Sequence, residues 1–295
     1  MNILLTPARI GSVEIPNRIV MPPMTTRTAD AEGYVTDDSV AYYLARARGG
    51  VGLITIEMAS PEKAGRHRRR EVGIYDDRFV PGLTRLVDEL HRAGSKVSIQ
   101  LGHGGGHTRI DICGETPIAP SAIPHPVYET TFETIVPEEM TQARIDATIA
   151  AHAAAARARA QGRLRLRRNP RRSRLPDLAV SRPVREPAHR CIWRRASRTG
   201  RASGSKRCAR SRPRCPECRS SIALSVEDFF PGGLPFDEGR RIAIWAAEAG
   251  ADALHVTAGH YRSLPSAQIV LPPMTFPDAT FLDFAADVKR RSRVP

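Results

Sequence analysis

The chain has 295 residues, 41% of them apolar, which is enough for one large α/β domain or two small ones. No run of 18 apolar residues occurs, and the first 20 residues lack the basic and apolar regions of a secretory signal. These features argue against a membrane span and against export. Five cysteines without an export signal fit a reducing compartment, so we expect a cytoplasmic protein.

The net charge of +14 is concentrated in one segment. Residues 163–219 hold 19 Arg and one Lys against three acidic residues, a net of +17, whereas the rest of the chain has a net of −3. We therefore expect no specific nucleic-acid partner, although the charge alone would otherwise indicate one. An Arg-rich RNA-binding arm is an alternative, but Trp193 is the only aromatic stacking residue there besides histidine. A zinc site at Cys215-Pro-Glu-Cys218 is another, but no second C-x₂-C pair exists, and we predict no metal site.

The flanks of this segment alternate between strand and helix patterns. Short apolar runs predict strands, and segments with apolar residues at helical spacing, most of them closed by glycine, predict helices. In chain order we predict a strand at 18–24, a helix at 37–50, a strand at 51–56, a helix at 80–94, a strand at 96–101, a helix at 141–161, a strand at 222–226, a helix at 236–250, a strand at 251–257 and a helix at 281–293.

Regular βα alternation indicates parallel strands with crossover helices. Units of this size suit a (β/α)₈ barrel, whose chemistry lies at the carboxyl ends of the strands. A doubly wound sheet is the alternative, but no G-x-G-x-x-G follows the first predicted strand.

Six short motifs occur in order along the flanks. They are Leu5-x-Pro7-x₃-Gly11-x₅-Asn17-Arg18-Ile19-Val20, Pro23-Met24-Thr25, Gly52-Leu53-Ile54 with Glu57, Gln100-Leu101-x-His103-x-Gly105, Pro117-x-Ala119-Pro120-Ser121-Ala122-Ile123-Pro124, and the stretch 224–233 (LSVEDFFPGG). This series resembles the old yellow enzyme family of NADH:flavin oxidoreductases, in particular its branch with 2,4-dienoyl-CoA reductase and 2-enoate reductase. One departure is Gly106-His107, where the family usually has Arg.

The resemblance implies an FMN-dependent ene-reductase on a TIM barrel, with NADH or NADPH as the reductant and a small enone or enoyl compound as the substrate. Flavin performs the hydride chemistry while the protein orients it. The resemblance places these cofactor-binding residues at successive strand ends: Pro23, Met24 and Thr25 on the first strand, Glu57 on the second, and Gln100 and His103 on the third. Gln100 would pair its amide with the pyrimidine ring, since one Gln offers both a donor and an acceptor.

Two further residues follow the last strand predicted before the final helix. His260 and Tyr261 lie where relatives can place a residue that contacts the substrate or donates a proton, so they are our catalytic candidates. A His-Tyr pair in a surface loop is the alternative interpretation of the same two residues.

The Arg-rich segment has the composition of a shifted reading frame. Back-translated with permitted codons and read one nucleotide later, 163–195 yields a long ordered run of the family's fourth-strand motif. We therefore interpret the chain as N-terminal barrel units at 1–161, an out-of-frame segment at 162–221 and later barrel units at 222–295. The expected fold is an incomplete TIM barrel that lacks its fourth βα unit and its last two units.

Several family features are absent from this sequence. The resemblance implies a histidine pair and a tyrosine on the fourth strand, and an Arg at the position of Ala223. Without them we expect a chain that is inactive as written. The alternative to an enzyme is a non-catalytic product of the shifted frame.

Overall fold

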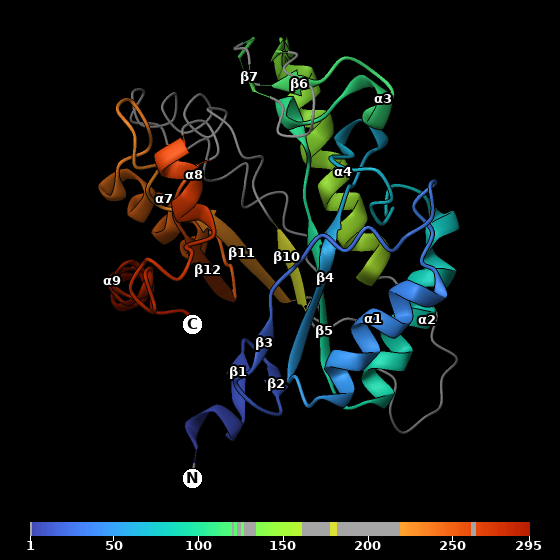
Figure 1. Cartoon of the computed structure of the whole chain (residues 1–295), viewed down its shortest axis with the longest axis vertical. Helices are drawn as coiled ribbons and strands as arrows, with labels where there is room; N and C mark the ends of the chain where they lie inside the picture. Colours follow the sequence, from blue (N-terminus) through green and yellow to red (C-terminus); the bar gives the residue numbers. More distant parts are fainter. Residues whose placement is uncertain are drawn as a thin grey trace.

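A six-stranded parallel sheet organises the molecule (Figure 1). The computed structural model describes residues 2–119, 121–122, 125–126, 134–160, 178–181, 219–260 and 264–295. The strands, in chain order, are β3 (Val20–Met21), β4 (Leu53–Ala59), β5 (Lys96–Leu101), β10 (Leu178–Ser181), β11 (Arg219–Ser225) and β12 (Ala253–Thr257). They pair in the spatial order β12-β11-β10-β5-β4-β3, and every pair is parallel. Their carboxyl ends therefore meet at one edge of the sheet.

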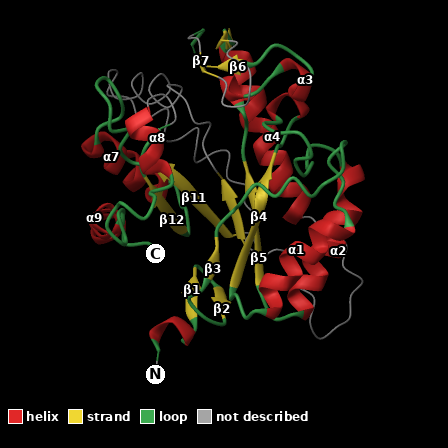
Figure 2. Ribbon diagram, viewed as in Figure 1, coloured by secondary structure: helices red, strands yellow, loops and turns green. Residues whose placement is uncertain are grey.

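Helices cover one face of this sheet (Figure 2). The helices are α1 (Asp37–Arg48), α2 (Val80–Arg92), α3 (Ile110–Cys113), α4 (Gln142–Ala160), α7 (Phe236–Glu248), α8 (Leu264–Val270) and α9 (Leu282–Ser292), with 3₁₀ turns η1 (Ile3–Leu5), η2 (Lys63–Gly65), η3 (Asp77–Phe79) and η4 (Gly105–His107). Alternate residues of β4 and β5 pack against α1, α2 and α4, and those of β11 pack against α7 and α9. This alternation leaves the opposite face of the strands to line the interior.

Local sequence signals explain where the first two of these helices begin. Thr36 accepts a hydrogen bond from the Ser39 amide and closes a capping box with the Ser39 side chain, so α1 starts at Asp37. Pro81 lies in the first turn of α2, where its missing N–H has no intrahelical partner to lose. The helix then buries Leu83, Leu86, Val87 and Leu90 at helical spacing.

Short strands lie outside the main sheet. The antiparallel hairpin of β1 (Ala8–Ile10) and β2 (Val13–Ile15) turns at Gly11, whose φ of 57° suits glycine, and it packs Ile15 against Leu53. In Figure 1 it lies at the lower end of the sheet, opposite the loops that follow the strands. The remaining strands form two small pairs, β6 (Ile118–Ala119) with β9 (Glu138–Glu139) and β7 (His125–Pro126) with β8 (Thr134–Ile135).

The sheet has a fourth strand, contrary to our expectation. β10 lies inside the Arg-rich segment and pairs with β5 on one side and β11 on the other. Its sequence, Leu-Ala-Val-Ser, is a short apolar run, and such a run can form a strand between two neighbours of a parallel sheet. The other residues from 161 to 218 lie outside the described residues, so the division of the chain at 161 and 221 stays a prediction.

The sheet is open among the described residues. β3 and β12 are its two edges and pair with each other nowhere in the described ranges, so these show no closed barrel. The α/β alternation that we predicted is confirmed along the flanks. None of the helices in the described part of the chain has both the length and the apolar character that a membrane span requires.

The pairing of β10 in the sheet can be tested by amide exchange. The amide hydrogens of Leu178–Ser181 should exchange with solvent at rates comparable with those of β5, because both strands are paired on two sides. Hydrogen–deuterium exchange measured by mass spectrometry resolves both peptides in one experiment. Exchange of the β10 amides at the rate of an unstructured peptide, with β5 protected, would show that this strand does not form.

Candidate functional site

The end of β4 contains an irregularity that decides which side chains face the interior. Ile56 pairs with Ile99 and Met58 pairs with Gln100, so Glu57 is an extra residue in a bulge. Paired residues on neighbouring parallel strands share a face, which puts Met58 on the same face as Gln100. Met58 is also the one residue of β4 that is only partly buried. Strict alternation from Thr55 would put Glu57 on the face of Gln100, but the bulge puts Met58 there instead. The sequence alone therefore does not identify Met58.

Glu57 is buried, with 1% of its surface exposed, and its carboxylate is directed at the loop after β3. Oε2 accepts a hydrogen bond from the Thr26 amide at 2.9 Å, and Oε1 accepts one from the Thr26 hydroxyl at 2.5 Å. The Glu57 amide donates to the hydroxyl of Tyr43 on α1 at 2.8 Å. Burial raises the pKa of Glu57, and the hydrogen bonds from Thr26 and the Arg27 amide oppose that rise. Glu57 therefore holds a loop, and Thr26 is a residue that the sequence analysis missed.

The three residues predicted to face the flavin follow β3 directly. Pro23 is half-buried, whereas Met24 (46% exposed) and Thr25 are open to solvent. They belong to an extended segment that continues to the start of α1. Their position at the carboxyl edge of the sheet leaves their backbone and side chains accessible to a ligand.

Gln100 lies near the carboxyl end of β5 on the interior face. It is 3% exposed, and its side-chain amide makes no hydrogen bond to any other residue that the structure describes. Its neighbour on this face, Ser98, is different, because its hydroxyl donates to the Thr55 hydroxyl at 2.7 Å. A buried amide of this kind has a donor and an acceptor to offer to a bound heterocycle.

His103 follows β5, with a hydrogen bond at Nδ1 and a carboxylate oxygen close to Nε2 that makes no hydrogen bond with it. Nδ1 accepts a hydrogen bond from the Gly105 amide at 2.9 Å, so the neutral ring carries its proton on Nε2. Nε2 lies 3.2 Å from Oε1 of Glu62, whose other oxygen is 2.8 Å from Arg144 of α4. Burial would raise the pKa of Glu62, but the contact with His103, then Thr148 and Arg144, lowers it to about 2. This arrangement fastens the loops after β4 and β5 to α4.

His260 lies at the same edge of the sheet, after β12. Its amide donates to the Ser266 hydroxyl at 2.6 Å, and its ring centroid is 5.7 Å from that of Phe230 and 6.2 Å from that of His107. His107 therefore joins the candidate site from the β5 loop, and its departure from the family pattern was the only sequence signal for it. Tyr261 lies outside the described residues.

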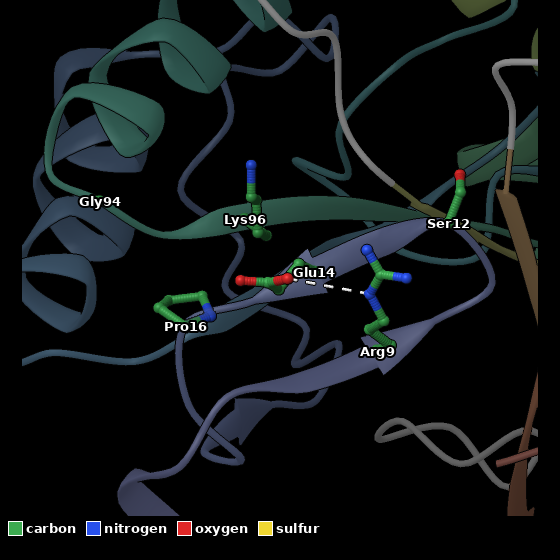
Figure 3. A pocket seen from close by; sticks show the side chains of 6 residues that line it. All are labelled: Arg9, Ser12, Glu14, Pro16, Gly94 and Lys96. Atoms are coloured by element: carbon green, nitrogen blue, oxygen red, sulfur yellow. Dashed lines mark ion pairs between the residues drawn. The ribbon is translucent and has the colours of Figure 1, made fainter.

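Two open cavities are lined by none of the candidate residues. The first, about 440 Å³, lies between the β1–β2 hairpin and the amino end of β5 (Figure 3). It is lined by Arg9, Ser12, Glu14, Pro16, Gly94 and Lys96, and Figure 3 shows the exposed Arg9–Glu14 ion pair across the hairpin. The second, about 470 Å³, lies between β12 and α9 and is lined by Val256 and residues between Pro272 and Ala285. We assign the candidate site from the strand ends, because all but one of the residues with predicted roles lie there in the structure.

Metal ligands do not gather in the described ranges. No group of three or more His, Cys, Asp or Glu side chains there could hold a metal ion. The cysteines at 191, 208, 215 and 218 fall outside the described residues, and Cys113 is a buried free thiol.

Comparison with known proteins gives a consistent result. Residues 3–162 match the family model described as NADH:flavin oxidoreductase / NADH oxidase. The chain is 32% identical to an NADH oxidase of Thermoanaerobacter brockii, over 99% of this chain and 44% of the relative. It is 42% identical to an NADPH dehydrogenase of Geobacillus sp. (strain WCH70), over 50% of this chain and 42% of the relative. The chain thus spans less than half the length of these relatives.

A solved structure shows the same fold. The old yellow enzyme homologue from Zymomonas mobilis superimposes with a TM-score of 0.73 at 18% identity, over 99% of this chain and 80% of that chain. The similarity extends over both flanks of the Arg-rich segment, so the predicted resemblance is confirmed at the level of family and fold.

The Glu62–His103 contact predicts a specific pH dependence. A folded-state pKa of about 2 against the ordinary 4.5 stabilises the fold above pH 4.5, and this contribution disappears as the pH falls towards 2. Glu62→Gln should therefore lower the free energy of unfolding at pH 7 by about 2–3 kcal/mol, with the difference from wild type shrinking below pH 4.5. Urea unfolding across this pH range measures it. Glu115→Gln removes a more exposed partner of Arg144 and is the control, and a pH-independent loss in Glu62→Gln would contradict the assignment.

Proposed function

The chain belongs to the NADH:flavin oxidoreductase / NADH oxidase family, and from this premise we propose that it binds FMN at the carboxyl ends of β3, β4 and β5. The family cofactor is FMN, with NADH or NADPH as the reductant. The proposed reaction class is reduction of an α,β-unsaturated carbonyl compound, as in the 2,4-dienoyl-CoA reductase and 2-enoate reductase branch that the sequence resembles.

The observation that carries the flavin site is the buried amide of Gln100, which makes no hydrogen bond to another described residue. Its side chain offers a donor and an acceptor at the strand end, and a ring with adjacent donors and acceptors can pair with both. Met58 shares its face and is partly exposed, which supports a ligand surface at this position. The residues present therefore fit the pyrimidine part of a flavin.

The other candidate residues divide into two groups by their contacts. Pro23, Met24 and Thr25 are open at the strand edge, and we assign them to direct contact with the flavin. The Glu57 carboxylate accepts hydrogen bonds from Thr26, and Nδ1 of His103 accepts one from the Gly105 amide, so we assign these two residues to supporting the site.

When bound, FMN would accept a hydride from NAD(P)H and pass it to the substrate alkene. The contribution of this chain is to orient the ring and to hold the substrate carbonyl. His260 and His107 bring two imidazoles together beside Phe230 at the same sheet edge, and His260 keeps its assignment as a substrate-contacting residue. Tyr261 keeps its assignment on sequence grounds alone.

Weak or absent turnover is part of this proposal. β10 takes the fourth position in the sheet with Leu178, Ala179, Val180 and Ser181, none of which offers the imidazole or phenol expected there. Ala223 on β11 offers no charge. Hydride transfer requires the substrate, the flavin and a proton donor in one geometry, and these side chains cannot supply the donor.

A non-catalytic product of a shifted frame is the second candidate. The family match ends at residue 162, one residue before the Arg-rich segment begins. The nucleotide sequence of codons 160–225 separates the two candidates, because a single-nucleotide shift at both boundaries would restore the family motif.

Replacement of Gln100 tests the flavin site. Gln100→Ala should weaken FMN binding by about 1–3 kcal/mol, or roughly five- to 150-fold in Kd, because it removes the proposed partner of the pyrimidine ring. Quenching of FMN fluorescence during titration measures Kd. Ser98→Ala, on the same face but nearer the amino end of β5, is the control, and equal Kd values for Gln100→Ala and wild type would refute the site.

Anaerobic oxidation of NADPH with a simple enone, in excess FMN, tests the activity. We expect turnover about 10²–10⁴-fold below that of a complete family member, the usual effect of losing a positioned acid. Turnover at the level of the complete enzyme would show that the chain holds its substrate by means other than a fourth-strand clamp.

A further inference from the structure

The loop between β3 and α1 has no regular secondary structure from residue 22 to residue 36. It contains Pro23–Thr25, the residues proposed to face the flavin. Its interactions with the rest of the protein therefore decide where those residues lie. The buried carboxylate of Glu57 provides the central ones.

Both oxygens of this carboxylate accept hydrogen bonds from the residue that follows Thr25. The Thr26 amide lies 2.9 Å from Oε2 and the Thr26 hydroxyl lies 2.5 Å from Oε1. At 1% exposure of Glu57 these hydrogen bonds have little competition from water.

The backbone of the next residue, Arg27, has a conformation that it would not favour in an unconstrained chain. Arg27 has a φ of 56°, a left-handed conformation that a residue with a Cβ adopts only at a cost in free energy. The Arg27 amide is a further donor to Glu57. One buried carboxylate thus gathers the donors of two consecutive residues and compensates for the strained backbone.

The network continues from the loop to the start of α1. The Thr26 and Thr28 hydroxyls are 2.7 Å apart, and the Thr28 hydroxyl lies 3.1 Å from that of Ser39. Ser39 is fully buried and forms the capping box of α1 with Thr36. On the other side, Glu57 precedes Met58, which pairs with Gln100. The same group therefore fixes the loop relative to α1, β4 and β5.

We propose that Glu57 is a positioning residue for the flavin site. It acts through Thr26 and Arg27 to hold Pro23–Thr25 in place relative to Gln100. This inference rests on the proposed function. It assigns the carboxylate no contact with the flavin, and it makes Thr26 as important as Glu57.

Two substitutions break the network from opposite sides. Glu57→Gln leaves one acceptor oxygen where the carboxylate has two, and Thr26→Val replaces the hydroxyl with a methyl group of similar size. Both should increase amide exchange at Thr25–Thr28 and the Kd for FMN by about tenfold or more, and shift the midpoint potential of the FMN that remains bound.

Two controls match these variants. Thr26→Ser restores the hydroxyl and should recover the wild-type values. Glu227→Gln alters another carboxylate, which follows β11 and accepts hydrogen bonds from the amides of Phe229 and Phe236. It should increase exchange at those two residues and leave the Kd and potential of FMN within about twofold of wild type.

The outcomes separate this inference from the proposed function. Wild-type Kd and potential in both Glu57→Gln and Thr26→Val, or unchanged exchange at Thr25–Thr28, would overturn it. If Glu57→Gln does not fold, Thr26→Val against Thr26→Ser decides alone. If the wild-type protein binds no FMN, the proposed function fails, and the exchange rates then decide whether Glu57 holds the loop.

Discussion

A carboxylate inside a protein is tolerated only where hydrogen-bond donors surround it, and Glu57 meets that condition by ordering the loop after β3. The bulge in β4 makes this possible, because it turns Glu57 towards the loop and leaves Met58 on the face of Gln100. The position of the candidate flavin-facing residues follows from this one interaction. The buried polar group and the open strand edge are thus parts of the same arrangement.

The two sides of the sheet edge are unequal. On the side of β3, β4 and β5, carboxylates contact the loops: Glu57 accepts hydrogen bonds from Thr26 at one loop, and Glu62 lies beside His103 and Arg144 at the next. On the side of β11 and β12, Ala223 lies on the interior face of β11, and His260 follows β12. A chain with this arrangement can keep the residues that orient the flavin while it lacks side chains that would bind the substrate.

Periodic patterns predicted most of the fold. The strand at Lys96–Leu101 was predicted with its observed bounds, and the helices at Val80–Arg92 and Phe236–Glu248 within two residues at their glycine-marked ends. The hairpin at Ala8–Ile15 was missed, because two strands of three residues give no usable alternation. β10 was missed because arginines dominate the composition around four residues that form it.

The candidate site was less predictable than the fold, for a physical reason. Motif order placed Gln100 at a strand end, where it lies, but no sequence pattern reveals a bulge, so the directions of Glu57 and Met58 needed the structure. The sequence motif indicates Thr25 and not Thr26, because only the tertiary contact of Thr26 with Glu57 distinguishes these adjacent threonines. His107 and His260 are far apart in sequence, and their proximity depends on loops from two strands that do not touch each other.

We propose that FMN lies at the carboxyl ends of β3, β4 and β5, and a crystal structure of the protein soaked with FMN would show whether it does. We expect density for the pyrimidine ring against the Gln100 amide, with Pro23–Thr25 along the ring and the Glu57 carboxylate still on Thr26. Flavin density in the cavity beside Arg9 and Lys96, or in that beside Val256, with the strand ends empty, would contradict it.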